Sequence, residues 1–163
     1  MAAPSVSLEG KNLWLAQSLP VVPWQVLRAK LDVQLVLTGV PVLFCALCMV
    51  IVLPGGALEK VLTVVVALLY TLLSALAALA LGLKMPNLTW TNEITPIKQS
   101  GCVMLSLFAN WFYAIALGGL YFLCGRYLSA AAYLALAAAI TAVVCALLLR
   151  WVKQRGTRIF AAL

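Results

Sequence analysis

The stretch LDVQLVLTGVPVLFCALCMVIVL, residues 31–53, decides the fold because it is long enough and apolar enough to cross a membrane. A helix needs about 20 predominantly apolar residues to span a hydrocarbon core, and a single segment can satisfy its backbone in lipid only as a helix. The one charged residue, Asp32, lies at the start. Pro41 interrupts the run and is expected to kink the helix. We therefore predict a transmembrane helix over these residues.

Three further apolar runs have the same character. They extend from Leu58 to Gly82, from Ser100 to Cys124 and from Leu128 to Leu149. Each is long enough to cross the bilayer as a helix. The sequence therefore predicts an all-α integral membrane protein with about four transmembrane helices.

The connecting and terminal segments complete the predicted organisation. The connectors Leu53–Gly56 and Gly125–Arg126 are short and contain turn residues, whereas residues 83–99 form one long connector. We divide the chain into a cytoplasmic segment with an amphipathic helix at residues 1–30, a four-helix transmembrane region at 31–149 and a basic tail at 150–163. The tail is expected to bind anionic lipids.

Composition excludes several classes of function. The chain has 163 residues, of which 66% are hydrophobic and 9% charged, with no histidine and four acidic residues. An enzyme would need a nucleophile with a base, or a set of metal ligands, so we expect no catalytic, cofactor-binding or metal-binding residues. The net charge of +7 could indicate nucleic acid. The basic residues, however, lie mostly at the ends of apolar runs, which is typical of membrane anchors, and no nucleic-acid partner is expected.

The positions of the basic residues predict an orientation. With four spans, both termini and the long connector share one side of the membrane. Nine basic residues fall on that side: Lys11, Arg28, Lys30, Lys84, Lys98, Arg150, Lys153, Arg155 and Arg158. Only Lys60 and Arg126 fall on the other. This bias places both termini in the cytoplasm.

Polar residues within the spans are few. A transporter driven by ions usually needs an ionisable residue within the membrane, and the deeper parts of these runs have none. Asp32 is expected to pair with Arg28 or Lys30 at the interface. Gln34 and Asn110 could line a path, but hydrogen bonds between helices are the favoured role.

Small residues in the spans have two interpretations. Cys45 and Cys48 form a C-x-x-C pattern inside an apolar run, which we interpret as small buried hydrophobes in preference to a zinc or redox site.

Ser74, Ala78 and Gly82 recur at intervals of four, and the fourth run is rich in alanine. Such spacing allows helices to approach closely. We favour packing within this chain, with an interface to other helices or a second copy as the alternative.

The segment EGKNLWLAQSLPVVPWQVLRAK, residues 9–30, precedes the first span. Leu13, Trp14 and Gln17 fall on one helical face, Pro20 and Pro23 break that helix, and a second helix starts near Trp24 and continues into the membrane. An amphipathic helix of this kind lies at the membrane surface. It either anchors the chain there or docks in the groove of a cytoplasmic partner, and the residues alone favour anchoring.

Two motifs in the chain resemble type-2 ABC transporter permeases. Glu9-Gly10-Lys11, Leu13-Trp14, Ser18-Leu19-Pro20-Val21 and Leu27 to Lys30 resemble the cytoplasmic coupling region of that family. Residues 86–93, PNLTWTNE, followed by Ile97-Lys98-Gln99, resemble the P-x-L-x-W-x-N-E…K-Q pattern of a bacterial subgroup of ABC exporters. The resemblance extends roughly from Ser7 to the third span.

The resemblance implies a mechanical role in transport. A separate cytoplasmic subunit binds and hydrolyses ATP, and its closure moves the coupling segment and biases the helices between inward and outward states. The residues implied in coupling are Glu9, Gly10, Lys11, Leu13, Trp14, Ser18, Pro20 and Lys30. The second cytoplasmic element comprises Pro86, Trp90, Asn92, Glu93, Lys98 and Gln99. Asn92 has an equally favoured role as the cap of the helix that leads into the third span.

The resemblance also sets expectations for location and partners. It implies a multi-pass protein of the bacterial cytoplasmic membrane that assembles with an ATP-binding subunit and with other permease helices or a second copy. Because further spans precede the coupling region in such permeases, the chain resembles the C-terminal part of one. The alternative function is a small four-span accessory or structural membrane protein with no transport activity of its own.

Overall fold

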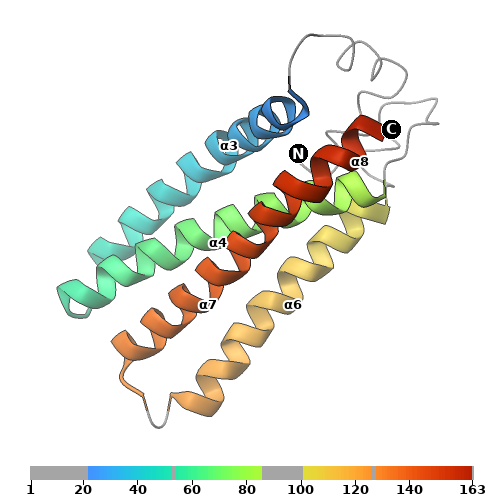
Figure 1. Ribbon diagram of the computed structural model, residues 1–163. Coiled ribbons are helices and arrows are strands. Elements are labelled where there is room, and N and C mark those ends of the chain that lie inside the picture. The colour runs from blue at the N-terminus through green and yellow to red at the C-terminus, as the bar shows by residue number, and fades with distance from the viewer. Residues whose placement is uncertain (1–21, 53, 86–100, 126–127, 163) are drawn as a thin grey trace.

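The protein is a bundle of long helices. The computed structural model describes residues 22–52, 54–85, 101–125 and 128–162, and no strand occurs among them. The long helices are α3 (Pro23–Val52), α4 (Ala57–Lys84), α6 (Gly101–Cys124) and α7 (Ala130–Trp151) (Figure 1). Each belongs to a helical segment long and apolar enough to cross a membrane. The prediction of an all-α membrane protein with four spans is therefore confirmed.

The helix ends follow local sequence signals. α3 begins at Pro23, where a proline lacks only an N–H that would have no helical partner. It continues through Pro41 as one helix, and the kink expected there stays a prediction. α4 has Glu59 in its first turn and Lys84 in its last, and both charges complement the helix dipole. Ser129 caps α7 by accepting a hydrogen bond from the backbone N–H of Ala132.

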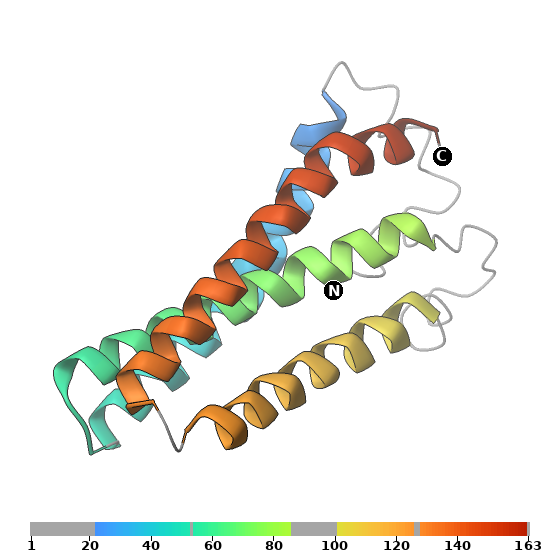
Figure 2. The same cartoon turned by 60° about the horizontal axis from the view of Figure 1, so that its bottom comes forward.

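Helix α4 is the central element of the bundle. It contacts α3, α6 and α7, and its contact with α7 is the most extensive among the described helices. Helix α6 contacts α4 and, to a smaller extent, α7. Figure 2 shows α6 to one side of the group that α3, α4 and α7 form. The bundle is thus a group of three closely packed helices with a fourth attached.

The core of the three-helix group pairs leucines with small residues. Leu73, Leu76 and Leu79 of α4 are buried. Ala137, Thr141 and Cys145 of α7 are also buried, and they recur at intervals of four residues. Because such residues form one stripe along a helix, two helices can approach closely there. The prediction that the small residues of the fourth run pack within this chain is confirmed for this stripe only, because other alanines of the run, such as Ala139 and Ala142, are exposed.

The C-terminal segment forms a helical extension of α7. A π-helical turn (η2, Val152–Gly156) leads into α8 (Thr157–Ala162), which contacts α3 and α4. Val152 and Phe160 are almost fully buried and join Leu27, Leu31 and Leu83 in one apolar cluster. Residues predicted only as a basic tail therefore also close one end of the core.

Candidate functional site: a polar cluster joining α6 to the bundle

Most residues that the sequence assigned to partner coupling lie outside the described residues. These are Glu9, Gly10, Lys11, Leu13, Trp14, Ser18, Pro20, Pro86, Trp90, Asn92, Glu93, Lys98 and Gln99. Their roles stay predictions. The exception is Lys30, which lies on α3 with its Nζ 6.0 Å from the centre of the Phe160 ring. A cation at this distance from an aromatic face is attracted by it, so Lys30 helps to hold the C-terminal helix against α3.

A cluster of polar side chains lies near the middle of the spans. The hydroxyl of Tyr70 on α4 donates a hydrogen bond of 2.9 Å to the backbone oxygen of Asn110 on α6. The hydroxyls of Tyr113 on α6 and Thr141 on α7 are 2.9 Å apart. The Tyr70 and Tyr113 rings stack with their centres 6.1 Å apart. The cluster therefore joins three helices at one level of the membrane.

The direction of the hydrogen bond between Tyr113 and Thr141 follows from the partners of Thr141. Its Oγ1 is 2.7 Å from the backbone oxygen of Ala137, which can only accept. A hydroxyl has one proton to donate, and that proton is used for the carbonyl oxygen. Tyr113 therefore donates to Thr141, and a single chain of hydrogen bonds runs from α6 into the backbone of α7.

A second tyrosine contact joins α6 to α7 further from the basic end. The hydroxyl of Tyr133 donates to the backbone oxygen of Leu117 at 2.7 Å, and its ring meets that of Tyr121 edge to face with centres 5.0 Å apart. Such edge-to-face pairs are a favourable aromatic arrangement. Three tyrosine hydroxyls thus connect α6 to the other helices.

Few of the described residues of α6 are buried against the rest of the bundle. Of its described residues only Cys102 and Ser106 are buried, whereas Trp111, Phe112 and Phe122 are largely exposed. Hydrogen bonds between transmembrane helices contribute on average about 0.6 kcal/mol each. A helix with few buried residues and a few such bonds can change its position at a small cost in free energy.

The sequence located this cluster only in part. The side chain of Asn110, expected to bond another helix, instead donates to the backbone oxygen of Ser106 in its own helix at 2.8 Å. Its backbone oxygen accepts the interhelical bond from Tyr70. A short amide commonly reaches the carbonyl four residues earlier, which explains the difference. The tyrosines were the missed signal, because a buried tyrosine hydroxyl usually needs a partner.

Two other predictions about polar residues can be compared with the structure. Arg28 and Asp32 form the expected ion pair, with Nε and Oδ2 3.7 Å apart. For Gln34, the backbone oxygen accepts a hydrogen bond of 2.7 Å from Thr38 in the same helix. The ion pair is confirmed, while the interhelical hydrogen bond expected of Gln34 stays a prediction.

The cysteines divide into two groups. Cys102 and Cys145 are buried, Cys124 is half-buried, and the Cys145 Sγ is 3.6 Å from the backbone oxygen of Leu69. Cys45 and Cys48 are exposed on α3, so this chain does not provide the burial predicted for them. Among the described residues, no group of three or more Cys, Asp or Glu could hold a metal ion.

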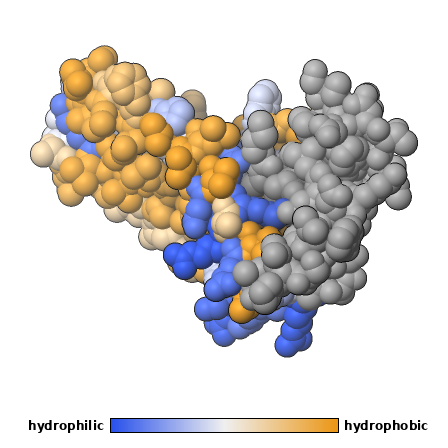
Figure 3. Space-filling view, turned by 90° about the horizontal axis from the view of Figure 1, so that it is seen from above, coloured by the Kyte–Doolittle hydropathy of each residue, from blue (hydrophilic) through white to orange (hydrophobic). Residues whose placement is uncertain are grey.

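One end of the bundle concentrates positive charge. The helix order brings the start of α3, the ends of α4 and α7, and the start of α6 to the same end (Figure 1). The view from above shows hydrophilic residues gathered there and hydrophobic residues over the neighbouring surface (Figure 3). The described basic residues at this end are Arg28, Lys30, Lys84, Arg150, Lys153, Arg155 and Arg158. Such an end fits the level of the lipid phosphates.

The fold and these sites define an α-helical multi-pass membrane protein. No family model, curated protein or solved structure matches the chain.

Proposed function

We propose that the chain is a membrane-spanning permease subunit, or part of one, of an ATP-driven ABC type-2 exporter. In this role it couples a separate cytoplasmic ATPase subunit to the movement of a substrate across the bacterial cytoplasmic membrane. It carries no catalytic residues of its own, and ATP is bound by the partner. The choice of this class of protein rests on the resemblance of residues 9–30 and 86–99 to type-2 ABC transporter permeases.

The attachment of α6 is the structural observation that supports transport. Alternating between two states requires an element that can repack against a stable remainder. The three-helix group of α3, α4 and α7 has a buried core of leucines. Helix α6 meets it mainly through the hydroxyls of Tyr70, Tyr113 and Tyr133. We infer that α6 is the element that moves when the partner subunit closes.

The distribution of charged residues favours ATP hydrolysis by a partner subunit over an ion gradient as the source of energy. The charged residues of α3 all lie in its first third, those of α4 lie in its first and last turns, and α6 has none between Gly101 and Cys124. Coupling to an ion gradient usually requires an ionisable group at depth. Closure of an ATPase at the basic end requires none, because it acts by moving helices.

Exposed apolar faces on α3 and α6 are consistent with the binding of additional helices or of a second copy of the chain. Phe44, Ile51 and Val52 on α3 are largely exposed, as are Trp111 and Phe122 on α6. In a membrane such faces contact either lipid or other helices. A permease assembled from more helices than this chain supplies would cover part of them.

The test is co-purification from the native host in mild detergent. We expect an ATP-binding subunit to copurify with the full tagged chain and to be lost from the Trp14→Ala, Pro20→Ala variant. The control is Leu147→Ala, because Leu147 is 63% exposed on α7 and lies outside the proposed coupling segment. Absence of any ATPase with the intact chain would overturn the proposal and favour the accessory protein, with residues 9–30 as a membrane anchor.

A further inference from the structure

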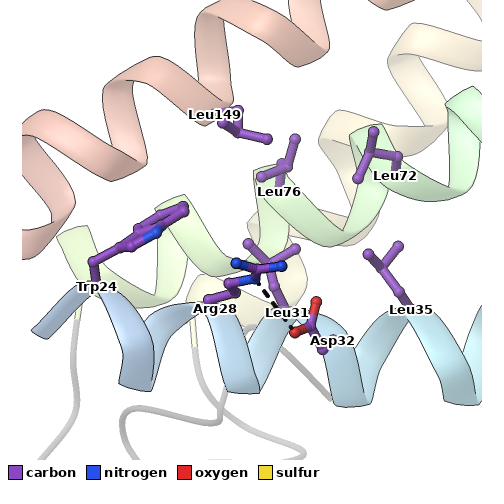
Figure 4. A pocket seen from close by; sticks show the side chains of 8 residues that line it. All are labelled: Trp24, Arg28, Leu31, Asp32, Leu35, Leu72, Leu76 and Leu149. Carbon is purple, nitrogen blue, oxygen red and sulfur yellow. Dashed lines mark ion pairs between the residues drawn. The ribbon is translucent and has the colours of Figure 1, made fainter. Parts of the chain in front are cut away.

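A groove between α3 and α7 opens near the basic end of the bundle. It has a volume of about 260 Å³. Leu31, Leu72 and Leu76 lie along its base, and Leu149 of α7 lies across from α3 (Figure 4). The remaining lining residues are Trp24, Arg28, Asp32 and Leu35. The groove is thus apolar along its length, with one charge of each sign at its side.

The groove has a polar end and an apolar end. Trp24 and Arg28 lie in the first turns of α3, and Leu35 lies deeper in the span. Between Trp24 and Leu35 the helix rises about 16 Å, roughly half of a hydrocarbon core. Leu72 of α4 is likewise further from the basic end than Leu76. A molecule in the groove would therefore place a polar head at the interface and an apolar chain towards the membrane centre.

The two charged side chains are available to such a head group. Their side chains are 69% and 62% exposed, and the atoms that pair them, Arg28 Nε and Asp32 Oδ2, are 3.7 Å apart. An exposed pair of this kind contributes between about 0 and 1 kcal/mol, so it opens at little cost. The guanidinium has five N–H donors and binds phosphate through two of them at once. The carboxylate accepts hydrogen bonds from an ammonium group.

We propose that this groove binds a phospholipid whose head group carries a primary ammonium, of the phosphatidylethanolamine type. The two charged groups meet at one level of the groove, 3.7 Å apart. The head group lies across the groove at that level, with its phosphate on Arg28 and its ammonium on Asp32, and one acyl chain lies along the leucines. The ethanolamine linker is short, so its phosphate and ammonium can reach side chains one helical turn apart. The Trp24 indole, at the polar end, is the kind of ring that favours the membrane interface.

Charge complementarity favours this head group over two others. The positive charge at this end attracts any anionic lipid, but the carboxylate of Asp32 lies beside the phosphate position and disfavours a head group with no positive charge. A choline head group has the positive charge but no N–H to donate to Asp32. Only the primary ammonium satisfies both side chains.

Native mass spectrometry of the full chain in detergent tests the proposal, with ethanolamine, choline and glycerol phospholipids that share the same acyl chains. We expect the ethanolamine lipid to be retained about fivefold more than the choline lipid, the upper range for one exposed ionic contact. Asp32→Asn should abolish this preference. Arg28→Gln should weaken retention of both the ethanolamine and the choline lipid. Arg158→Gln, exposed on α8 outside the groove, is the control and should change neither.

A second pair of variants tests the groove itself without altering charge. Leu149→Trp places a large side chain in the groove and should reduce retention of all three lipids. Leu147→Trp introduces the same side chain at a position of α7 that is 63% exposed and should leave retention unchanged. Equal retention of all three lipids by the unmodified chain, or a preference that survives Asp32→Asn, would overturn the proposal.

Discussion

Tyr70 offers the most direct test of how α6 is held. Its hydroxyl reaches the backbone of α6, while its ring stacks on that of Tyr113. Tyr70→Phe removes the hydrogen bond and keeps the ring. We expect the free energy of unfolding to fall by about 0.6–1.5 kcal/mol, the range for hydrogen bonds between transmembrane helices, in reversible unfolding experiments in detergent micelles.

Tyr121 supplies the control for this measurement. It lies on α6 with half of its surface exposed, and its hydroxyl makes no hydrogen bond within the described residues. Tyr121→Phe should change the free energy of unfolding by less than about 0.3 kcal/mol, a small effect of the kind seen for surface substitutions. Equal effects of the two substitutions would contradict the role assigned to the Tyr70 hydroxyl.

Residue-level contacts were the least predictable part of the structure. Hydropathy identifies how deep a residue lies but not which neighbour it meets. Lipid is as apolar as leucine, so a leucine such as Leu76 at the core and one such as Leu107 facing outward look alike in sequence. The ion pair of Arg28 and Asp32 was predictable because both residues lie one turn apart on the same helix.

At the scale of elements, α4 carries the packing of the bundle. Leu76 is fully buried at the junction of α3, α4 and α7. We expect Leu76→Ala to lower the free energy of unfolding by about 2 kcal/mol, at the low end for buried leucines, because the lost contacts are partly replaced by lipid in the unfolded state. Leu107→Ala, at a position of α6 that is 54% exposed, should cost less than about 1 kcal/mol in the same assay.

The C-terminal extension depends on close approach at Gly156. A Cβ built at this position would lie 3.1 Å from Leu83 Cδ1 of α4. Alanine requires only a small shift of that flexible side chain, but Gly156→Leu should displace α8 and Phe160 from the core. Hydrogen–deuterium exchange of residues 157–162 should then become faster, as expected for a segment that opens locally.

Gly118→Leu is the matched control for the extension. Nothing lies within 4 Å of the position that a Cβ would occupy at Gly118 on α6, so exchange in α8 should not change. Protection of α8 that is unaffected by Gly156→Leu would show that Gly156 is not required for its docking.

Element boundaries were predictable because they depend on run length and turn residues. The expected third span, Ser100 to Cys124, agrees with α6 to within one residue. Gly56, the last residue of a predicted connector, precedes α4, and α7 begins at Ala130, two residues after the predicted start at Leu128. The π-helical turn and the docking of Phe160 were not predictable, since both depend on contacts with α3 and α4. In the candidate site, the sequence identified Asn110 as a polar residue within a span, but it did not identify Tyr70 as the residue that bonds to it.

At the scale of the whole molecule, the even number of spans makes a topological prediction. The start of α3 and the end of α8 lie at one end of the bundle, and the α3–α4 turn lies at the other. The described basic residues gather at the first of these ends, while Lys60 lies near the second. Positive charge is retained on the cytoplasmic side, so residue 154 should be cytoplasmic and residue 56 should face outward.

Single cysteines introduced at these two positions, with the native cysteines replaced, test topology and orientation separately. A membrane-impermeant maleimide added to intact cells should label Gly56→Cys at once and Gln154→Cys only after permeabilisation. Labelling of both from the same side would contradict the arrangement of spans in the bundle. Labelling of Gln154→Cys alone in intact cells would preserve the bundle but reverse its orientation. In that case the basic end would face away from the cytoplasm, and an ATPase could not dock there.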